Sequence, residues 1–319
     1  MLLSIVIPAY NAERFIEKTL SLLISQGLTE TEVIVVNDGS KDKTREIVEN
    51  IAKNNTAIKL INQENKGESG ARNSGIQAAT GEYIYFLDCD DSLKDGSLDY
   101  FRKTINSNPD KDMYAFGYVS NENGVEKDYS NKKFSSCDFS KDEFLKLYLS
   151  KHINTHICSF ITRKKILNLA NAKFQLGLRI GADIDYILRL YPRLDSIHYE
   201  SRKCYIYQIR GDSIMQGYKN YSVAQYHSFE VRRDIVLNDF YQNDELKNFS
   251  NFWIENQLIS NIFYYLRSSF KDKNITNNLI NDCDLFKRSI SKTHGALKNK
   301  FAIMIFKLLP IKKLLKISK

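Results

Sequence analysis

The stretch SIVIPAYNAERFIEKTLSLLISQGLTETEVIVVND, residues 4–38, decides the fold class. It begins with SIVIPAY and ends with EVIVVND, two short apolar runs of the kind found in strands that are buried on both faces. Between them, apolar residues recur every three or four positions from Phe15 to Ile24, so residues 13–26 should form an amphipathic helix. Strand, helix and strand in this order predict a βαβ unit with parallel strands.

The same alternation continues to about residue 88. We expect helices over 42–54 and 69–81, and strands over 58–63 and 83–88. Repeated βαβ units imply an open, largely parallel α/β sheet, in which ligands bind beyond the carboxyl ends of the strands. The loops at those ends are PAYNAE, NDGSKDKT, NQENKGESGARN and DCDD.

The composition is that of an ordinary folded protein. The chain has 319 residues, of which 43% are hydrophobic and 26% charged, enough for one large domain or two. The five cysteines form no CxxC pair, so we expect free thiols in a reducing cytosol rather than a zinc site or a disulfide framework. The N-terminus has no basic region before its apolar run, and no signal peptide is expected.

Beyond residue 100 the pattern changes. A further strand is expected over 112–120, a polar hairpin or loop over 121–140, and a helix over 140–151. Residues 220–290 have a helical pattern and are rich in aromatic side chains. We place a domain boundary near residue 215, which divides the chain into a domain over 1–215 and a helical region over 216–319.

Asp38 ends the second strand and is followed by a tight Gly-Ser turn into a helix. A carboxylate at this position could accept a hydrogen bond from a base N–H or a ribose hydroxyl. The alternative is a plain turn in which the side chain caps the helix.

The loop NKGESGARNSG carries three glycines but is not a P-loop, because its lysine precedes the glycines and GxxxxGK[ST] is absent. No GxGxxG follows the first strand, which argues against a dinucleotide dehydrogenase. The glycines would let the backbone approach a ligand closely, and Arg72 could face a base or a phosphate. The alternative is a plain turn.

In DCDD, residues 88–91, three carboxylates follow a hydrophobic strand. Two carboxylates about 5 Å apart repel by roughly 3 kcal/mol at an effective dielectric near 20, so we expect a compensating charge. Residues two apart on a strand point the same way, which would let Asp88 and Asp90 converge on one Mn²⁺ or Mg²⁺ ion together with water and phosphate oxygens. The alternative is an exposed acidic turn in which Asp91 caps a helix.

In this order and spacing, SIVIPAYN, VIVVNDGSKDKT, NKGESGARNSG and GEYIYFLDCDD resemble the inverting family 2 glycosyltransferases, which have the GT-A fold. The resemblance is specific over residues 1–100 and looser to about 215. It implies an α/β fold with a Rossmann-like, mixed and mainly parallel sheet flanked by helices, and a helical, basic C-terminal extension. Residues 1–100 would bind a nucleotide-diphospho sugar, and 101–215 would provide the acceptor side and the base.

The resemblance also implies a donor site. Asp38 and the end of the first strand would hold the nucleotide, and the Lys-Gly and Ala-Arg loop would lie beside the base. The DxD aspartates would bind the donor's ribose and diphosphate and the metal ion, which would sit chiefly on Asp90. The residues expected in the donor site are Pro8, Ala9, Tyr10, Glu13, Asp38, Lys66, Gly67, Arg72, Asp88 and Asp90.

The segment GADIDYILRL, residues 181–190, resembles the Glu-Asp pair and aromatic residue that open a helix in this family, with Ala182 in place of the glutamate and Tyr186 in place of phenylalanine. Asp183 would then be the base that takes the proton from an acceptor hydroxyl. The alternative for Asp183 is an acid favoured by the helix dipole. Asp185 is expected to cap the helix or to form an ion pair.

The segment CYIYQIRGDSIMQ, residues 204–216, resembles the aromatic strand and Arg-x-x-Ser that follow the base helix in the family. Arg210 could reach the diphosphate and stabilise the leaving group. A surface ion pair is the alternative. We interpret the five histidines as structural or surface residues, because His198 and His227 have no second ligand at metal-site spacing.

The net charge is +8, and the tail over residues 296–319 contributes seven lysines and no acid. Its apolar run is too short to cross a bilayer. A basic amphipathic end of this kind predicts an anchor on an anionic membrane surface; the alternative is a helix that packs on the body of the protein. No nucleic-acid-binding signature accompanies the charge, so no nucleic acid partner is expected.

We therefore expect a metal-dependent inverting hexosyl- or N-acetylhexosaminyltransferase. Its donor would be a nucleotide-diphospho sugar, with UDP as the expected nucleotide, and its acceptor a glycan or a polyprenyl-diphosphate-linked glycan of surface polysaccharide synthesis. It would act in the cytoplasm, peripherally on the inner face of a bacterial plasma membrane. The alternatives are a nucleotidyltransferase and a non-catalytic glycan- or membrane-binding protein on the same scaffold.

Overall fold

The computed structural model describes residues 1–168, 172–210, 221–287 and 310–317. Contacts between residues divide the chain into two compact units. The first unit comprises Met1–Lys141, Asn154–Gly177 and Arg189–Arg210, and the second comprises Asp142–Ile153, Leu178–Leu188 and Gly211–Lys319. The boundary predicted near residue 215 lies outside the described residues, so the division into 1–215 and 216–319 stays a prediction.

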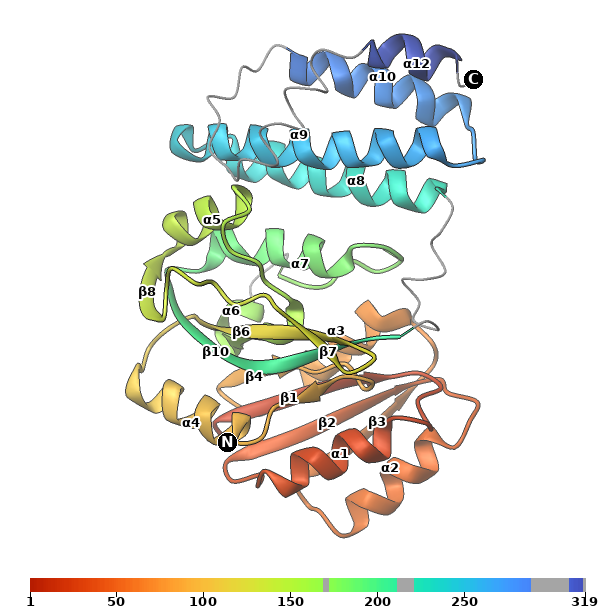
Figure 1. Ribbon diagram of the computed structural model, residues 1–319. Helices are drawn as coiled ribbons and strands as arrows, with labels where there is room; N and C mark the ends of the chain where they lie inside the picture. Colours follow the sequence, from red (N-terminus) through yellow and green to blue (C-terminus); the bar gives the residue numbers. More distant parts are fainter. Residues whose placement is uncertain (169–171, 211–220, 288–309, 318–319) are drawn as a thin grey trace. The chain divides into compact units, whose positions relative to one another are not determined.

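The first unit is built on one mixed β-sheet (Figure 1). Its first four strands, which run parallel to one another, are β1 (Leu3–Ala9), β2 (Thr31–Asp38), β3 (Ile58–Gln63) and β4 (Tyr83–Phe86). The remaining described strands are β5 (Ser92–Leu93), β6 (Met113–Glu122), β7 (Val125–Asp128), β8 (Ser136–Ser140), β9 (Phe160–Arg163) and β10 (Ser196–Ile209). The strand order is β3-β2-β1-β4-β9-β6-β10-β5, with β7 beside β6 and β8 beside β10. Every residue of β1 and β2 is buried, as the apolar runs predicted.

Helices cover both faces of the parallel strands. The helices of the first unit are α1 (Ile16–Ser25), α2 (Thr44–Lys53), α3 (Gly67–Ala78), α4 (Ser97–Ser107) and α6 (Lys164–Leu167). Right-handed crossovers place α1 and α2 on one face, and the return from β3 to β4 places α3 on the other (Figure 1). α3 approaches β1 so closely that a Cβ atom added to Gly75 would lie 2.2 Å from Cγ1 of Val6. This glycine therefore sets the distance between α3 and the sheet.

A buried glutamate joins the amino ends of the parallel strands. Glu32 of β2 has a side chain that is 1% exposed, and it accepts hydrogen bonds from Ser4 Oγ of β1 at 2.6 Å and from Lys59 Nζ of β3 at 2.7 Å. It also accepts from the backbone N–H of Thr80, ahead of β4, at 2.6 Å. Burial raises the pKa of Glu32, but the hydrogen bonds from Lys59, Ser4 and Thr80 outweigh it and bring the pKa to about 2. One carboxylate thus connects β1, β2 and β3 with the segment that precedes β4.

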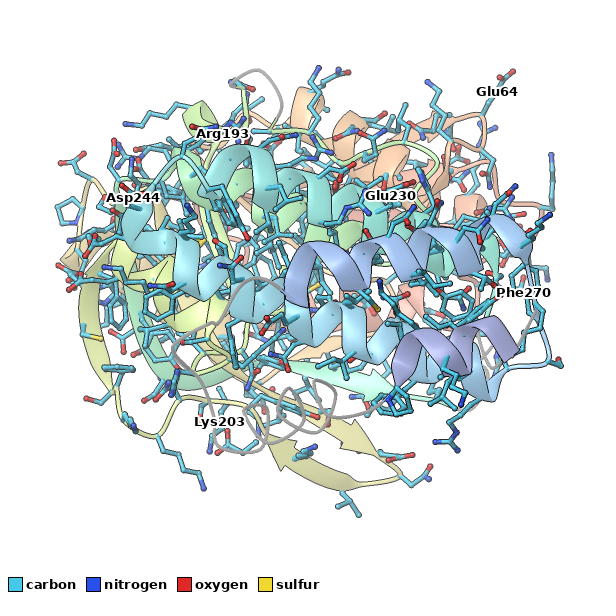
Figure 2. The ribbon with its side chains drawn as sticks, turned by 90° about the horizontal axis from the view of Figure 1, so that it is seen from above. Glu64, Arg193, Lys203, Glu230, Asp244 and Phe270 are labelled. Carbon is cyan, nitrogen blue, oxygen red and sulfur yellow. The ribbon has the colours of Figure 1, made fainter. Side chains whose placement is uncertain are left out.

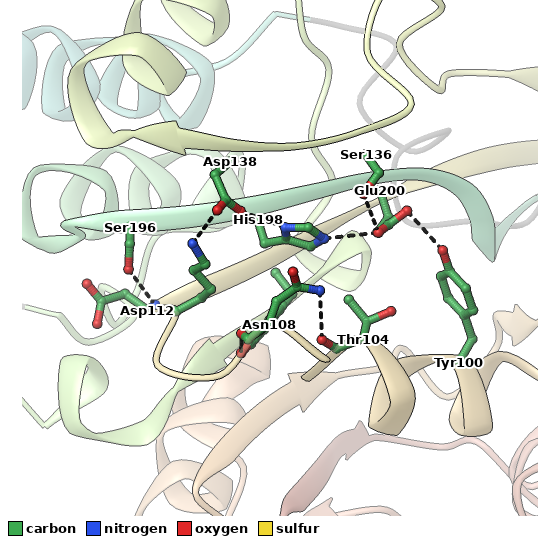
Figure 3. Close-up of polar contacts among 11 residues, drawn as sticks. Tyr100, Thr104, Asn108, Asp112, Ser136, Asp138, Ser196, His198 and Glu200 are labelled. Atoms are coloured by element: carbon green, nitrogen blue, oxygen red, sulfur yellow. Dashed lines mark hydrogen bonds and ion pairs between the residues drawn. The ribbon is translucent and has the colours of Figure 1, made fainter. Parts of the chain in front are cut away.

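A second polar cluster joins β8, β10 and α4 (Figure 3). The ring nitrogens of the buried His198 on β10 lie 2.7 Å from Asp138 Oδ1 on β8 and 2.9 Å from Glu200 Oε1 on β10. Glu200 also accepts a hydrogen bond from the Tyr100 hydroxyl of α4 at 2.9 Å. These contacts fasten the antiparallel β8–β10 pair and agree with a structural role for His198.

The second unit is helical. Its described helices are α5 (Lys141–Leu149), α7 (Ala182–Leu190), α8 (Val223–Ile235), α9 (Asp244–Arg267), α10 (Lys273–Lys287) and α12 (Ile311–Ile317). α9 packs against α8 and α10, and Figure 2 shows it running from Asp244 toward Phe270. α12 packs on α10 and buries Leu315, while Leu314 is 40% exposed. The rest of the predicted membrane-anchoring tail, 296–309 and 318–319, lies outside the described residues.

Among the residues that the structure describes, none of the helices is both long and apolar enough to cross a membrane.

We predict that Glu32→Gln lowers the free energy of unfolding by about 2–3 kcal/mol at pH 7, because an amide replaces an ionised acceptor of buried hydrogen bonds. The pKa of the carboxyl is about 2 in the folded state and 4.5 at its ordinary value. Its stabilising contribution is therefore complete above pH 4.5 and is lost as the pH falls toward 2. Urea unfolding followed by circular dichroism measures the free energy of unfolding. The values for the wild type and the variant should converge as the pH falls from 4.5 toward 2.

The matched control is Glu49→Gln on α2, whose side chain is 43% exposed. It should change the free energy of unfolding by less than about 0.5 kcal/mol. If Glu32→Gln lowers the free energy of unfolding by the same amount at pH 3 and at pH 7, the prediction is wrong.

Candidate functional site

The acidic turn DCDD lies outside β4. The strand ends at Phe86 rather than at Asp88 as predicted, and Leu87 N makes its last bond to β1, to Val6 O at 3.0 Å. The chain then turns, with Asp91 N donating to Asp88 O at 3.1 Å. The premise that Asp88 and Asp90 point the same way along a strand is therefore wrong, because strand pairing has ended before them. Each carboxylate of the turn has a different protein partner.

Arg72 of α3 compensates Asp88. Its Nη2 lies 2.7 Å from Asp88 Oδ1 and 2.5 Å from Glu68 Oε1, and its side chain is fully buried. The guanidinium also lies over the Phe174 ring at 5.2 Å, and Asn73 holds the backbone of Phe174 by two hydrogen bonds of 3.0 Å. Burial raises the pKa of Asp88, but the Arg72 charge outweighs it and holds the pKa below its usual value. The structure thus places Arg72 behind the acidic turn, as its fixed counter-charge.

Arg210 compensates Asp90. Its Nη2 forms an ion pair with Asp90 Oδ2, and its Nη1 donates to Asp90 O at 3.0 Å. The guanidinium stacks on the Phe15 ring at 4.3 Å. Burial and the Asp88 charge raise the pKa of Asp90, although Arg210 opposes them. The Asp90 side chain is still 37% exposed, so this contact, unlike the Arg72 pair, is open to exchange.

Asp91 is held by the last strand of the sheet. The Tyr205 hydroxyl and the Gln208 backbone N–H, both on β10, donate to its two carboxylate oxygens, the latter at 2.8 Å. Burial, together with repulsion from Asp88 and Asp90, raises the pKa of Asp91 well above its usual value. Asp91 is 4% exposed and serves as the inner support of the turn, in contact with β10.

Asp38 lies under the Lys66–Gly67 turn. Its Oδ1 accepts from Gln63 Nε2 at 2.6 Å and from Lys66 N at 2.9 Å. Among the described residues, Oδ2 has no hydrogen-bond partner. Gly67 has φ +75°, a left-handed conformation that favours glycine, and Lys66 is exposed. The turn therefore orients one oxygen of Asp38 and leaves the other for a hydrogen-bond donor.

The loop after β1 supplies the remaining predicted residues. Pro8 and Ala9 are buried at the end of the strand, whereas the Tyr10 ring is 54% exposed. Glu13 accepts a hydrogen bond from Lys43 N at 3.0 Å, so it fastens this loop to the start of α2. The exposed aromatic ring beside a rigid loop is suited to stacking on a planar ligand.

A cavity of about 780 Å³ opens beside the acidic turn in the first unit. Its walls carry the basic side chains Arg14, Lys18 and Arg210 together with Asp90 and Asp91. Its size is within the usual range of small-molecule sites. Positive charge around a partly exposed carboxylate suits an anionic ligand that arrives with a divalent cation.

The turn fits a divalent cation that is shared with a ligand. The described residues contain no cluster of three His, Cys, Asp or Glu side chains that could hold a metal ion alone. Mg²⁺ and Mn²⁺ sites of phosphate-binding enzymes need only one or two carboxylates, with water and phosphate oxygens as the other ligands. Asp90 meets this requirement, with Asp88 next to it.

Asp183 belongs to the other unit. It is the second residue of α7 and is partly exposed, whereas the predicted donor residues and Arg210 all belong to the first unit. The neighbouring Asp185 is fully buried. Burial lowers the pKa of Arg232, and Tyr148 and then Asp185 oppose that lowering. The expectation that Asp185 caps the helix or forms an ion pair stays a prediction.

Sequence reasoning missed the residues that hold the acidic turn. Tyr205 and Gln208 lie in the segment 204–216, where alternation of aromatic and polar residues is a signal for side chains that face inward beside Arg210. Phe15 is visible only as part of an apolar helix face. Phe174 contacts Arg72 from more than 100 residues away, and no local pattern indicates that contact.

Comparison with known proteins gives a family and a fold. The family model described as "Glycosyl transferase family 2" matches residues 4–169. Staphylococcus aureus TarS 1–349, solved in complex with UDP-GlcNAc, superposes with a TM-score of 0.72 and 21% identity over 100% of this chain and 93% of that chain. This likeness confirms the predicted GT-A fold with a helical C-terminal region.

Two curated relatives align over most of the chain. EpsJ of Bacillus subtilis, described as an uncharacterized glycosyltransferase, is 28% identical over 67% of this chain. The alignment spans 63% of the length of EpsJ. The GalNAc(5)-diNAcBac-PP-undecaprenol beta-1,3-glucosyltransferase of Campylobacter jejuni is 29% identical over 74% of each chain.

We predict that Arg72→Met lowers the free energy of unfolding by about 3 kcal/mol or more, because Asp88 is left as an uncompensated charge. Adding Asp88→Asn to this variant should recover part of the loss. Urea unfolding of the single and double variants measures the coupling between the two residues.

Arg45→Met on α2 is the control. Its side chain is 63% exposed and paired only with Glu49, so the loss should stay below about 0.5 kcal/mol. Strictly additive effects of Arg72→Met and Asp88→Asn would mean that the pair is not coupled.

Proposed function

The chain belongs to glycosyl transferase family 2, and we propose that it transfers a sugar from a nucleotide-diphospho sugar to an acceptor hydroxyl, with inversion at the anomeric carbon. The observation that carries this proposal is the arrangement at the carboxyl ends of the parallel strands. There, Asp38 presents one carboxylate oxygen, and the acidic turn presents a partly exposed Asp90 beside Arg210. The glycosyltransferases that resemble the chain in sequence and fold support the same activity.

The nucleotide would bind between the loops that follow β1, β2 and β3. Tyr10 offers a ring for the base, and Oδ2 of Asp38 can accept a hydrogen bond from the ribose or the base. Lys66 and Gly67 close over Asp38 and would contact the same part of the donor. We propose UDP as the nucleotide, which is supported by the complex of TarS with UDP-GlcNAc.

The diphosphate would meet the acidic turn. Asp90, with Asp88 beside it, would hold Mn²⁺ or Mg²⁺, and the ion would neutralise charge on the departing nucleoside diphosphate. Arg210 already lies at Asp90, and its planar guanidinium is suited to donate hydrogen bonds to the phosphate oxygens in place of the carboxylate. Arg72 stays buried and fixes Asp88 throughout.

Asp183 would act as the base. It lies in the first turn of α7 and is partly exposed, and a carboxylate can take the proton of the acceptor hydroxyl. The hydroxyl oxygen then attacks the anomeric carbon as the bond to the diphosphate breaks.

The acceptor would be a glycan or a lipid-linked glycan of a surface polysaccharide. The Campylobacter jejuni relative is named for a PP-undecaprenol-linked acceptor, and Lys313 on α12 is exposed, where a lysine can meet an anionic lipid surface. We propose that the protein works peripherally on the inner face of the plasma membrane, with part of its predicted anchor outside the described residues.

Calorimetric titration with UDP, GDP, CDP and dTDP, each with and without Mn²⁺, tests the donor site. We expect one nucleotide, UDP, to bind at least tenfold more tightly with Mn²⁺. Asp90→Asn should remove most of this metal dependence, whereas Asp95→Asn, at an exposed position, should preserve it. If none of the nucleotides binds, the proposal is wrong and a non-catalytic binding protein becomes the better interpretation.

Asp183→Asn tests the base. We expect the rate of transfer to fall by about 10² to 10⁴, the usual contribution of a general base, while UDP affinity stays within twofold of the wild type. The control is Asp195→Asn, whose carboxylate is 89% exposed and should leave both quantities unchanged. Transfer by Asp183→Asn near the wild-type rate would exclude Asp183 as the base.

A further inference from the structure

Lys151 occupies a backbone position that favours glycine. α5 ends in a Schellman motif, in which Lys151 N donates to Tyr148 O at 3.0 Å and His152 N donates to Leu147 O at 2.9 Å. The C′ residue of such a motif is left-handed, and Lys151 has φ +61°. A side chain with a Cβ atom is strained there, and glycine is not. The lysine is therefore held at a conformational cost, which points to a use for its side chain.

The ammonium group of Lys151 lies against aromatic rings. Its Nζ is 5.6 Å from the centroid of the Trp253 ring and 5.9 Å from that of Tyr148. Among the described residues, neither a carboxylate nor a hydrogen-bond acceptor pairs with it. Lys146, earlier on the same helix, shows the ordinary arrangement, because its ammonium lies 2.8 Å from Glu245 Oε1. Lys151 is thus a partly buried cation that has no anionic partner in the part of the chain that the structure describes.

A second cation lies nearby. Burial and then the charge of Arg232 lower the pKa of Lys151 to about 8. Arg232 of α8 is 7% exposed, and its Nε donates to Ser228 O at 2.8 Å. Two enclosed positive charges within electrostatic range destabilise each other unless an anion is bound between or beside them. Burial lowers the pKa of Arg232 as well, and Tyr148 and then Asp185 oppose that lowering without cancelling it.

The cation pair adjoins the turn that carries the proposed base. A Cβ atom added to Gly181 would lie 3.1 Å from Arg232 Nη1, and Gly181 directly precedes α7, whose second residue is Asp183. The Trp253 ring beside Lys151 offers a further donor, because its Nε1 has no hydrogen-bond partner among the described residues. Lys151, Arg232, Trp253 and Asp183 all belong to the second unit.

We propose that Lys151 and Arg232 form a binding site for a phosphate group of the acceptor substrate. This inference rests on the proposed glycosyl transfer and names the class of acceptor, an anionic glycan that carries phosphate close to the hydroxyl that reacts. The phosphate comes either from the diphosphate of a lipid carrier or from a phosphodiester in a polymeric acceptor. The strain at Lys151 is maintained because only a long cationic side chain at this point reaches the phosphate.

The test is calorimetric titration of the full chain, saturated with UDP and Mn²⁺, with farnesyl diphosphate and separately with a glycerol-phosphate oligomer. We expect at least one probe to bind the wild type, with an affinity that falls at least tenfold in Lys151→Met. Lys151→Gly should lose the same affinity while its thermal unfolding temperature rises, because the backbone strain is removed. Lys146→Met, the matched control on α5, should bind as the wild type does.

Each outcome has one meaning. Binding of farnesyl diphosphate alone assigns the phosphate to a lipid carrier, and binding of the oligomer alone assigns it to a polymeric acceptor. Absence of binding by both probes, or equal affinity in Lys151→Met and the wild type, overturns the inference. A loss of UDP affinity in Lys151→Met also overturns it, because Lys151 would then contribute to binding of the nucleotide-sugar donor.

The same experiment separates this inference from the proposed function. If UDP fails to bind while a probe still binds through Lys151, the donor proposal fails and the phosphate site stands. If UDP binds and sugar is transferred, but the affinity for the probes does not depend on Lys151, only the phosphate-site inference is wrong.

Discussion

The structure depends on the compensation of three carboxylates in one short turn. Asp88, Asp90 and Asp91 repel one another, and each is stabilised by its own donors. Arg72 of α3 pairs with Asp88, Arg210 directly after β10 pairs with Asp90, and Tyr205 and Gln208 of β10 donate to Asp91. For Arg72 to reach Asp88, α3 has to lie close to the sheet, which is why a glycine faces Val6 at position 75. The packing of the first unit therefore follows from the electrostatic needs of the turn.

The partners of the turn differ in how readily they exchange. Arg72 is fully buried under Phe174 and cannot leave Asp88 without exposing a charge to a poorly solvated environment. Arg210 lies at the rim, on the Phe15 ring, and its carboxylate partner is over a third exposed. Arg72 is the fixed, buried counter-charge and gives the turn a stable shape. Arg210 is the exchangeable counter-charge at the rim and leaves Asp90 accessible. At the opposite, amino ends of the strands, Glu32 accepts hydrogen bonds from protein donors. We assign it a role in stability.

The residues proposed for the two substrates belong to different compact units. The residues proposed for the nucleotide-diphospho sugar lie in the first unit, and the proposed base and the Lys151–Arg232 pair lie in the second. Lys151, which follows α5 with φ +61°, lowers the stability of the helix end.

The sequence by itself determined the order of strands and helices in the first hundred residues and the loops that carry the candidate donor site. Periodicity and loop composition are local properties, and β1, α1, β2, α2 and β3 follow them within a few residues. Only the tertiary structure decided where β4 ends, because pairing with β1 stops at Leu87. It also decided which donors compensate the acidic turn, how Phe174 covers Arg72, and that Lys151 has aromatic neighbours. These contacts join residues far apart in the chain, and they exist only once the sheet and the helices have packed, so no local spacing encodes them.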